Sequence, residues 1–324
     1  MRRILLSITV IVFLGMVFGG VARLDQPRLA PLRVGTNVWP GYEPLYLARS
    51  MGLYRDNDIH LVELHSATDV LHLFRNGELD AAALTLDEVL TLLQDHYDLR
   101  VVLVMDVSAG GDMLLARSDI GVLPQLRGKT IGVEHSGVGA ILLDGALAAA
   151  GLTLDDINLK RLTVAEHRRA FLQGRVDAVV TFDPVATHLL QDGARKLFDS
   201  SRIPGRIVDV LVVRKDAIEP YREGLKRLVH GYFQAVQFLK DSPRKAVLQM
   251  QGRLGLSPEG ILHSYQGMRL PSLQENRDYL TGAPSPLEVK ARELADLMLE
   301  NDLLDRPINF SRLTEARLLP REQP

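Results

Sequence analysis

Residues 74–81 read FRNGELDA, and residues 171–178, which lie 97 positions further along the chain, read FLQGRVDA. Two further pairs of segments share this offset: Gly35 with Gly132, and DMLLARSD at 112–119 with DVLVVRKD at 209–216. Three separate matches at one offset indicate that a structural unit has been duplicated. Because the period is long, we expect two copies of one lobe and not a solenoid of short repeats.

Each copy alternates short apolar strands with helical segments. Strands are predicted at residues 32–35, 59–64, 81–86, 101–105, 130–133, 159–162 and 176–181. This alternation is typical of parallel sheets. After residue 216 the pattern becomes helical, with segments at 221–240, 243–251, 259–265 and 286–301. The sequence therefore predicts an α/β fold of two similar lobes with mixed, mainly parallel sheets, joined by two crossing hinge strands and followed by a helical C-terminal tail.

The repeat also predicts where the lobes begin and end. Lobe I is expected to comprise residues 32–115 and 213–324, and lobe II residues 116–212. The chain would cross between them near residues 115–117 and return near residues 212–214. The helical tail would then pack on lobe I. Two lobes that are joined in this way form a hinged clamp.

The first 22 residues have the layout of an exported segment. Arg2 and Arg3 precede an apolar run over residues 4–18, and small residues follow at 19–22. This order is typical of a signal peptide, although the run approaches the roughly 20 residues that span a bilayer. Two alternatives remain, a cleaved signal peptide and a retained membrane anchor, with residues 23–31 as a tether. Either alternative places the rest of the chain in the periplasm.

The composition excludes several classes of function. The chain has no cysteine, which excludes disulfides, thiolate metal sites and cysteine nucleophiles. The formal net charge is -2, so the bulk charge gives no sign of nucleic-acid binding. His65, His135 and His188 are scattered and lack the spacing of metal ligands. A Gly-x-Ser-x-Gly elbow is absent too, so we expect neither an enzyme nor a bound metal or cofactor.

A candidate binding site follows the first strand, where residues 37–42 read NVWPGY. Proline and glycine end the strand and place the rings of Trp39 and Tyr42 beside free backbone amides. Ligands bind at this edge of an open parallel sheet; the alternative is that both rings plug the core. Ligand-binding residues are predicted in the corresponding loops of both lobes: Asn37, Trp39, Tyr42, Thr85, Asp87, Asp106, Ser108, Asp112, Glu134, Ser136, Gly137, Thr181, Asp183 and Asp209.

The charge of these loops predicts the charge of the ligand. Acidic residues recur in them, whereas no Lys or Arg lies within the loop spans. This favours a ligand that bears an amine or a protonated heterocycle. Ser136 and Gly137 stand at the start of a helix whose free amides suit an acidic group, so a zwitterion or a sulfonate-type solute also fits. The alternatives are that the acids cap helices and turns, and that Ser136 is a plain N-cap.

Six segments carry a resemblance to a known family: residues 35–48, residues 52–54, NGELD at 76–80, LRGKTIGV at 126–133, GRVDA at 174–178 and FDP at 182–184. They resemble type II periplasmic solute-binding proteins of ABC transporters, in the nitrate/sulfonate/taurine and thiamine-precursor branch. The resemblance implies a monomer that captures a small solute and presents it to an inner-membrane ABC permease and its ATPase. The alternative is a periplasmic ligand sensor that feeds a membrane receptor. Enzymes in the thiamine-precursor branch rely on a cysteine cluster, which this chain lacks.

Overall fold

The computed structural model describes residues 30–134, 137–310 and 312–322. The predicted signal peptide or anchor at 1–22, nearly all of the tether, and Ser136 therefore lie outside the described residues. Within the described part of the chain, no helix combines the length and the apolar character that a membrane crossing requires. From Pro31 onward the chain forms one unit that is built on two sheets.

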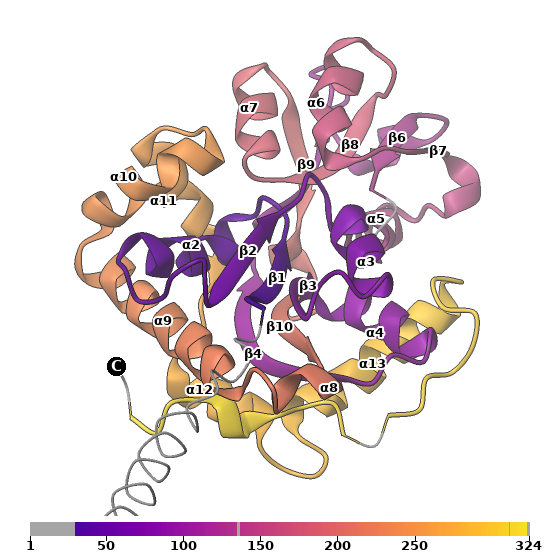
Figure 1. Cartoon of the computed structure of the whole chain (residues 1–324). Helices are drawn as coiled ribbons and strands as arrows, with labels where there is room; N and C mark the ends of the chain where they lie inside the picture. Colours follow the sequence, from indigo (N-terminus) through magenta and orange to yellow (C-terminus); the bar gives the residue numbers. More distant parts are fainter. Residues whose placement is uncertain (1–29, 135–136, 311, 323–324) are drawn as a thin grey trace, which may run out of the picture. The chain divides into compact units, whose positions relative to one another are not determined.

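Eleven strands form these sheets: β1 (Leu32–Thr36), β2 (Ile59–Glu63), β3 (Ala81–Thr85), β4 (Leu99–Ser108), β5 (Asp112–Ala116), β6 (Thr130–Val133), β7 (Asn158–Arg161), β8 (Ala178–Phe182), β9 (Arg195–Asp199), β10 (Val208–Arg214) and β11 (Met268–Arg269). The sheet of lobe I has six strands in the order β11-β4-β10-β3-β1-β2. The sheet of lobe II has five strands in the order β7-β6-β8-β5-β9. Figure 1 shows the second sheet at the top, with helices packed around both.

Helices cover the sheets and build the tail. The helices that follow strands are α2 (Glu43–Ser50), α3 (Ala67–Arg75), α4 (Leu86–Gln94), α5 (Gly137–Ala150), α6 (Val164–Leu172) and α7 (Val185–Gln191). The tail holds α8 (Lys215–Ile218), α9 (Arg222–Asp241), α10 (Pro243–Leu254), α11 (Pro258–Gln266), α12 (Leu273–Leu280) and α13 (Pro286–Glu300). Short 3₁₀ turns include η1 (Pro40–Tyr42) and η4 (Ser200–Arg202). As expected, the tail packs on lobe I, with α9 against α2 and α13 against α4.

The strand pairing repeats at the offset found in the sequence. β1 pairs in parallel with β3 through Val34 and Ala81, and β6 pairs with β8 through Ile131 and Ala178, which lie 97 residues later. Each sheet also contains one antiparallel strand from the other copy, because β10 lies between β3 and β4 and β5 lies between β8 and β9. The two-lobed α/β fold with mixed sheets is confirmed. Among the named strands, parallel pairing joins β1 to β2 and β3, and β6 to β7 and β8.

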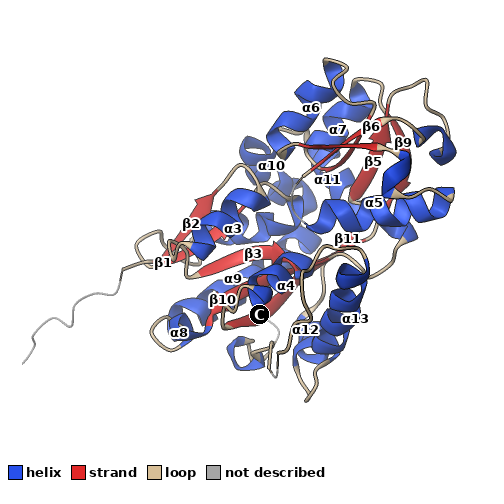
Figure 2. Ribbon diagram, turned by 90° about the vertical axis from the view of Figure 1, so that its right-hand side faces the viewer, coloured by secondary structure: helices blue, strands red, loops and turns tan. Residues whose placement is uncertain are grey.

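The crossings between the lobes differ from the predicted positions. The chain leaves the first sheet after Ser108 and enters the second at Asp112. Figure 2 shows β5 with β6 and β9 at the upper right, and β10 with β3 at the lower left. It returns between Asp199 and Val208. The predicted points at 115–117 and 212–214 fall in or at the ends of β5 and β10. The physical reason is that each repeated strand lies between two neighbours in the other lobe's sheet and is buried on both faces. Its apolar pattern therefore does not reveal which sheet it joins.

A buried ion pair ties the helical tail to lobe I. Arg253, on α10, donates from Nε to Glu43 Oε1 at 2.9 Å, and the Glu43 side chain is only 1% exposed. The guanidinium of Arg253 also lies over the ring of Tyr46. Burial raises the pKa of Glu43 to about 7, and the charge of Arg253 opposes that rise. Glu43 therefore depends on Arg253 to be charged at neutral pH.

Replacing Arg253 is expected to destabilise the protein in a pH-dependent way. Arg253→Ala should lower the free energy of unfolding by about 3 kcal/mol near pH 8.5, because Glu43 is left buried and unpaired. Below about pH 6 the loss should shrink, since Glu43 then takes up a proton. Urea unfolding at both pH values measures the difference, and Glu43→Gln combined with Arg253→Ala should recover part of the loss. Equal losses at both pH values would assign the effect to packing on Tyr46 instead.

Candidate functional site

A small cavity of about 20 Å³ lies between the two lobes. It is lined by residues of both: Asn37, Trp39, Tyr42, Ala67, Thr85, Glu88, Ile207 and Asp209 from lobe I and its connection, and Asp112, Glu134, Val138 and Phe182 from lobe II. Most of these residues lie at or just beyond the ends of strands, where ligands bind in open α/β sheets. A cavity of this volume has room for about one water molecule.

The lobes contact each other directly around this cavity. The rings of Trp39 and Phe182 meet edge to face, with their centroids 5.4 Å apart. The hydroxyl of Thr68 donates to Glu134 Oε1 at 3.3 Å, and the hydroxyl of Ser264, on α11, donates to Asp183 Oδ2 at 2.5 Å. The clamp is therefore closed, and any solute larger than water requires the lobes to separate before it enters.

The turn η1 fixes the two aromatic residues that the sequence singled out. Trp39 donates from its indole nitrogen to Asp106 Oδ2 at 3.0 Å, and Tyr42 donates from its hydroxyl to Asp209 Oδ1 at 2.6 Å. Gly41 permits the approach, since a β carbon there would lie 1.8 Å from Asp106 Oδ2. The two rings pack in the hydrophobic core of lobe I and also line the cavity.

Buried carboxylates dominate the surroundings of the cavity, and neither Lys nor Arg lines it. Five of these side chains are at most 5% exposed and have at least one oxygen without a hydrogen-bond partner among the described residues: Asp87, Glu88, Asp106, Asp112 and Glu134. A buried acceptor without a partner costs about 1–3 kcal/mol, and more if it is charged. The arrangement would therefore be stabilised by a cation or by a ligand rich in hydrogen-bond donors.

Burial shifts the proton affinities of these carboxyls. Desolvation raises the pKa of Asp87, Asp106 and Glu134 to about 7, and that of Asp112 to about 6. The same cause raises the pKa of Asp209 well above its ordinary value, and the charge of Asp106 adds to the rise. Near neutral pH the cluster therefore holds protons, which a cationic ligand would displace.

Most of the predicted site residues come together here. Asn37, Trp39, Tyr42, Thr85, Asp112, Glu134 and Asp209 line the cavity. Asp106 does not line the cavity but accepts a hydrogen bond from the indole of Trp39, which does. Asp87 and Gly137 face each other across the lobe boundary, since a β carbon on Gly137 would lie 2.3 Å from Asp87 Oδ2.

Three other predicted residues lie away from the cavity and make structural hydrogen bonds. Ser108 shares a hydrogen bond with Ser200 at 2.7 Å where the lobes join, and Thr181 shares one with His167 at 3.1 Å. Asp183 accepts from the backbone amide of Thr187 at 2.9 Å and from Ser264. These side chains therefore already have partners within the protein.

Five residues that line the cavity are absent from the predicted list: Ala67, Glu88, Val138, Phe182 and Ile207. Glu88 lines the cavity and accepts from the backbone amide of Thr85 at 2.9 Å, as the last residue of a capping box. The T-x-x-E spacing of Thr85 and Glu88 was a signal that could have placed this carboxylate beside Thr85. Phe182 had no comparable signal, because an aromatic residue at the end of a strand reads as core.

The buried carboxylates do not form a recognisable metal centre among the described residues. Among the residues that the structure describes, no group of three or more His, Asp or Glu side chains is placed to hold a metal ion. His167 is buried beside Thr181, and desolvation lowers its pKa to about 4, which keeps the ring neutral.

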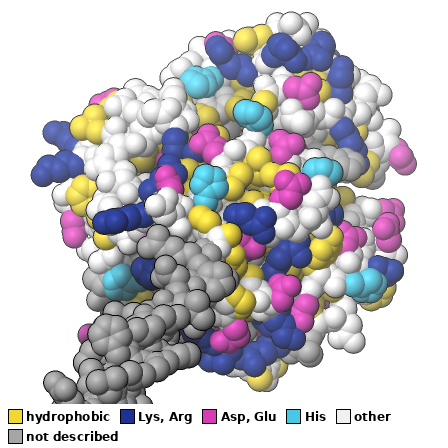
Figure 3. All heavy atoms as spheres, in the orientation of Figure 1, with side chains coloured by type: hydrophobic (Ala, Val, Ile, Leu, Met, Phe, Trp, Pro, Cys, Tyr) yellow, Lys and Arg dark blue, Asp and Glu magenta, His cyan; other side chains and the backbone are white. Residues whose placement is uncertain are grey.

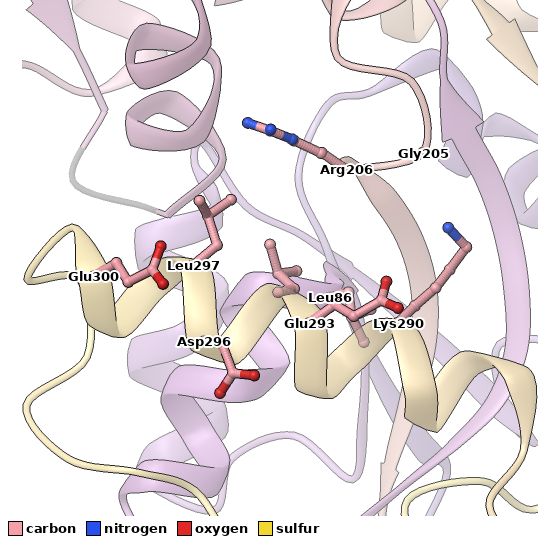
Figure 4. Close-up of a pocket in the computed structure, with 9 residues that line it drawn as sticks. Leu86, Gly205, Arg206, Lys290, Glu293, Asp296, Leu297 and Glu300 are labelled. Carbon is pink, nitrogen blue, oxygen red and sulfur yellow. The ribbon is translucent and has the colours of Figure 1, made fainter. Parts of the chain in front are cut away.

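A larger pocket of about 350 Å³ runs along α13 beside Gly205 (Figure 4). Its charged side chains have both signs: Arg206 and Lys290 are basic, and Glu293, Asp296 and Glu300 are acidic. The face of the molecule seen in Figure 3 likewise has basic and acidic side chains interspersed. The smaller cavity is the better candidate, because it alone of the two combines buried aromatic rings with buried, unpartnered carboxylates.

Comparison with known proteins agrees with this architecture. Residues 25–250 match the model of the NMT1-like family. The chain belongs to this family. A protein of Escherichia coli (strain K12) that is named for the binding of aliphatic sulfonates is 27% identical to this NMT1-like chain over 291 residues, with 86% of each chain covered. The match confirms the resemblance to the nitrate/sulfonate/taurine branch.

Solved structures share the fold of this NMT1-like protein. The alkanesulfonate-binding protein from Xanthomonas axonopodis pv. citri, bound to MOPS, superposes with a TM-score of 0.72 at 21% identity, covering 86% of this chain and 95% of that one. The ligand-binding component of an ABC-type import system from Staphylococcus aureus, with zinc bound, gives 0.73 at 14% identity, covering 91% and 100%. The fold is therefore that of periplasmic binding proteins.

Proposed function

We propose that this NMT1-like chain is the solute-binding subunit of an ABC importer. It would work in the periplasm, close its two lobes around a small solute, and deliver the solute to an inner-membrane permease and its ATPase. The Escherichia coli relative and the Staphylococcus aureus protein support this role, because both are named for binding and not for catalysis. The sensor alternative has no such support.

We further propose that the solute bears an amine or another protonated nitrogen. The observation that carries this proposal is the set of buried carboxylates with unpartnered oxygens and no Lys or Arg beside them. At about 4 Å and an effective dielectric near 20, an ammonium and a carboxylate attract by about 4 kcal/mol. The ring of Trp39 adds a flat face for cation–π contact, worth roughly 0.5–2 kcal/mol. A zwitterion also belongs to this class if its amine faces the acids.

A simple sulfonate fits the cavity poorly, even though relatives are named for sulfonates. Its negative charge would meet Asp112, Glu134 and Asp209 with neither Lys nor Arg in the lining. Like charges held close together in a desolvated site repel strongly. This NMT1-like chain would therefore share the architecture of those relatives and differ from them in the charge of its solute.

A panel of solutes tests the proposal by thermal shift at pH 8. Putrescine and taurine, which both bear an amine, are compared with ethanesulfonate and nitrate, which bear none. A solute at 100 times its dissociation constant should stabilise the protein by about 2.7 kcal/mol. We expect stabilisation by at least one amine-bearing compound and none by ethanesulfonate or nitrate. Stabilisation by ethanesulfonate alone, confirmed by calorimetry, would contradict the assignment of charge while leaving the importer role in place.

A further inference from the structure

The start of helix α5 faces the boundary between the lobes. The first amides of a helix lack partners within the helix and carry partial positive charge, so they attract anions. In this helix of 14 residues the first described position is Gly137, and Val138 lines the cavity. A ligand anion in the cleft would have this helix start within reach.

A carboxylate of the protein already occupies that position. A β carbon on Gly137 would lie only 2.3 Å from Asp87 Oδ2, so the carboxylate fills the space that a side chain on Gly137 would take. Asp87 is fully buried, and neither of its oxygens makes a well-formed hydrogen bond with a described residue. Burial raises its pKa to about 7, and proximity to the Thr85 hydroxyl and to the amides of Asp87 and Val138 offsets part of the rise.

Asp87 reaches this position from the other lobe. It belongs to the first turn of α4 in lobe I, where the Thr85–Glu88 capping box fixes the helix start, and α4 packs against α5 of lobe II. The carboxylate thus lies between the starts of two helices, one from each lobe, and both helix dipoles favour a negative charge there.

We infer that Asp87 is a specificity-determining residue, which excludes anionic groups from the cleft by occupying the start of α5 with a carboxylate of the chain itself. The inference rests on the proposed function only in taking the cleft between the lobes as the solute site. A sulfonate that approached α5 would meet both the bulk and the charge of Asp87. Removing the side chain should therefore admit a sulfonate, whatever amine the unmodified protein binds.

Titration calorimetry with ethanesulfonate at pH 8 tests this inference. Asp87→Gly removes both the charge and the bulk beside Gly137, and is expected to bind ethanesulfonate at least about tenfold more tightly than the unmodified protein, or about 1.4 kcal/mol. Asp87→Asn keeps the bulk and removes the charge, so its gain should be smaller, at about threefold. Asp112→Asn is the matched control, because it removes a charge from the same cavity and leaves Asp87 in place.

The outcomes separate the inference from its alternatives. An equal gain in ethanesulfonate affinity in Asp87→Gly and Asp112→Asn would overturn the inference. The total charge of the cleft, and not the carboxylate at the start of α5, would then exclude anions. Binding of ethanesulfonate by the unmodified protein as tight as that of Asp87→Gly would overturn it too. Circular dichroism checks the folding of each variant; if Asp87→Gly does not fold, Asp87→Asn decides, and no gain there refutes the inference. Failure of every amine to bind would instead refute the proposed solute class.

Discussion

Raising the pH from about 5.5 to about 8.5 should lower the melting temperature of the protein, measured without added solute, by roughly 6 °C or more. Burial raises the pKa of Asp87, Asp106 and Glu134 to about 7 and that of Asp112 to about 6, whereas these groups titrate near 4 in an unfolded chain. Between those values the folded protein binds more protons than the unfolded one, so stability falls as the pH rises. One pKa unit corresponds to about 1.4 kcal/mol, and each kcal/mol to about 2 °C in a large domain.

Scanning fluorimetry at constant ionic strength measures this slope. The double variant Asp106→Asn, Asp112→Asn should flatten it, because amides do not titrate in this range. Asp56→Asn is the control, since Asp56 is an exposed carboxylate and its loss should leave the slope unchanged. An amine that binds the cleft should raise the melting temperature more at pH 8.5 than at pH 5.5. A melting temperature that stays constant or rises up to pH 8.5 would show that the buried acids keep ordinary proton affinities.

The second large effect concerns Asp209. Asp209→Asn should weaken the binding of an amine-bearing solute by roughly 30- to 100-fold, or about 2–3 kcal/mol. Asp209 lines the cavity, and its Oδ1 accepts from the hydroxyl of Tyr42 at 2.6 Å, which holds the carboxylate in place. The substitution removes a charge that would lie against the amine, and desolvation of both groups keeps the loss below the full Coulomb energy.

Asp183→Asn provides the matched control for this measurement. Both aspartates are 3% exposed, and each follows or begins a strand next to the cleft. The oxygens of Asp183, however, accept from Thr187 and Ser264, and Asp183 does not line the cavity. Calorimetry should therefore show a change of less than about threefold for this variant. A larger loss in Asp183→Asn than in Asp209→Asn would place the solute elsewhere in the cleft.

Much of the fold was predictable because the duplication is preserved in the sequence. The offset predicted two lobes with equivalent strands, and the pairing of Val34 with Ala81 does recur 97 residues later as that of Ile131 with Ala178. The exchange of β5 and β10 between the lobes did not follow, because a strand buried on both faces has the same apolar pattern in either sheet. The crossings were therefore predicted several residues too late along the chain.

The cavity residues that lie at strand ends were predictable, because their place along the chain is enough to put them beside the cleft. Trp39, Tyr42, Asp112 and Asp209 follow or begin strands, and strand ends converge on one edge of a sheet. Whether each carboxylate has a hydrogen-bond partner within the protein was not predictable, because the partners are distant in sequence. The carboxylate of Asp183 accepts a hydrogen bond from Ser264, which lies 81 residues later in the chain. The sequence around Asp183 gives no sign of this contact.

The exchange of β5 and β10 has a consequence for how the chain is made. The sheet of lobe I lacks its central strand until residues 208–214 have left the ribosome, although β1 to β4 end by Ser108 of the 324-residue chain. A half-synthesised chain therefore cannot complete even its first lobe, and it exposes the edges of β3 and β4 on which β10 will later pair. A nascent polypeptide with this property remains unfolded for longer, which would favour the export that the proposed periplasmic role requires.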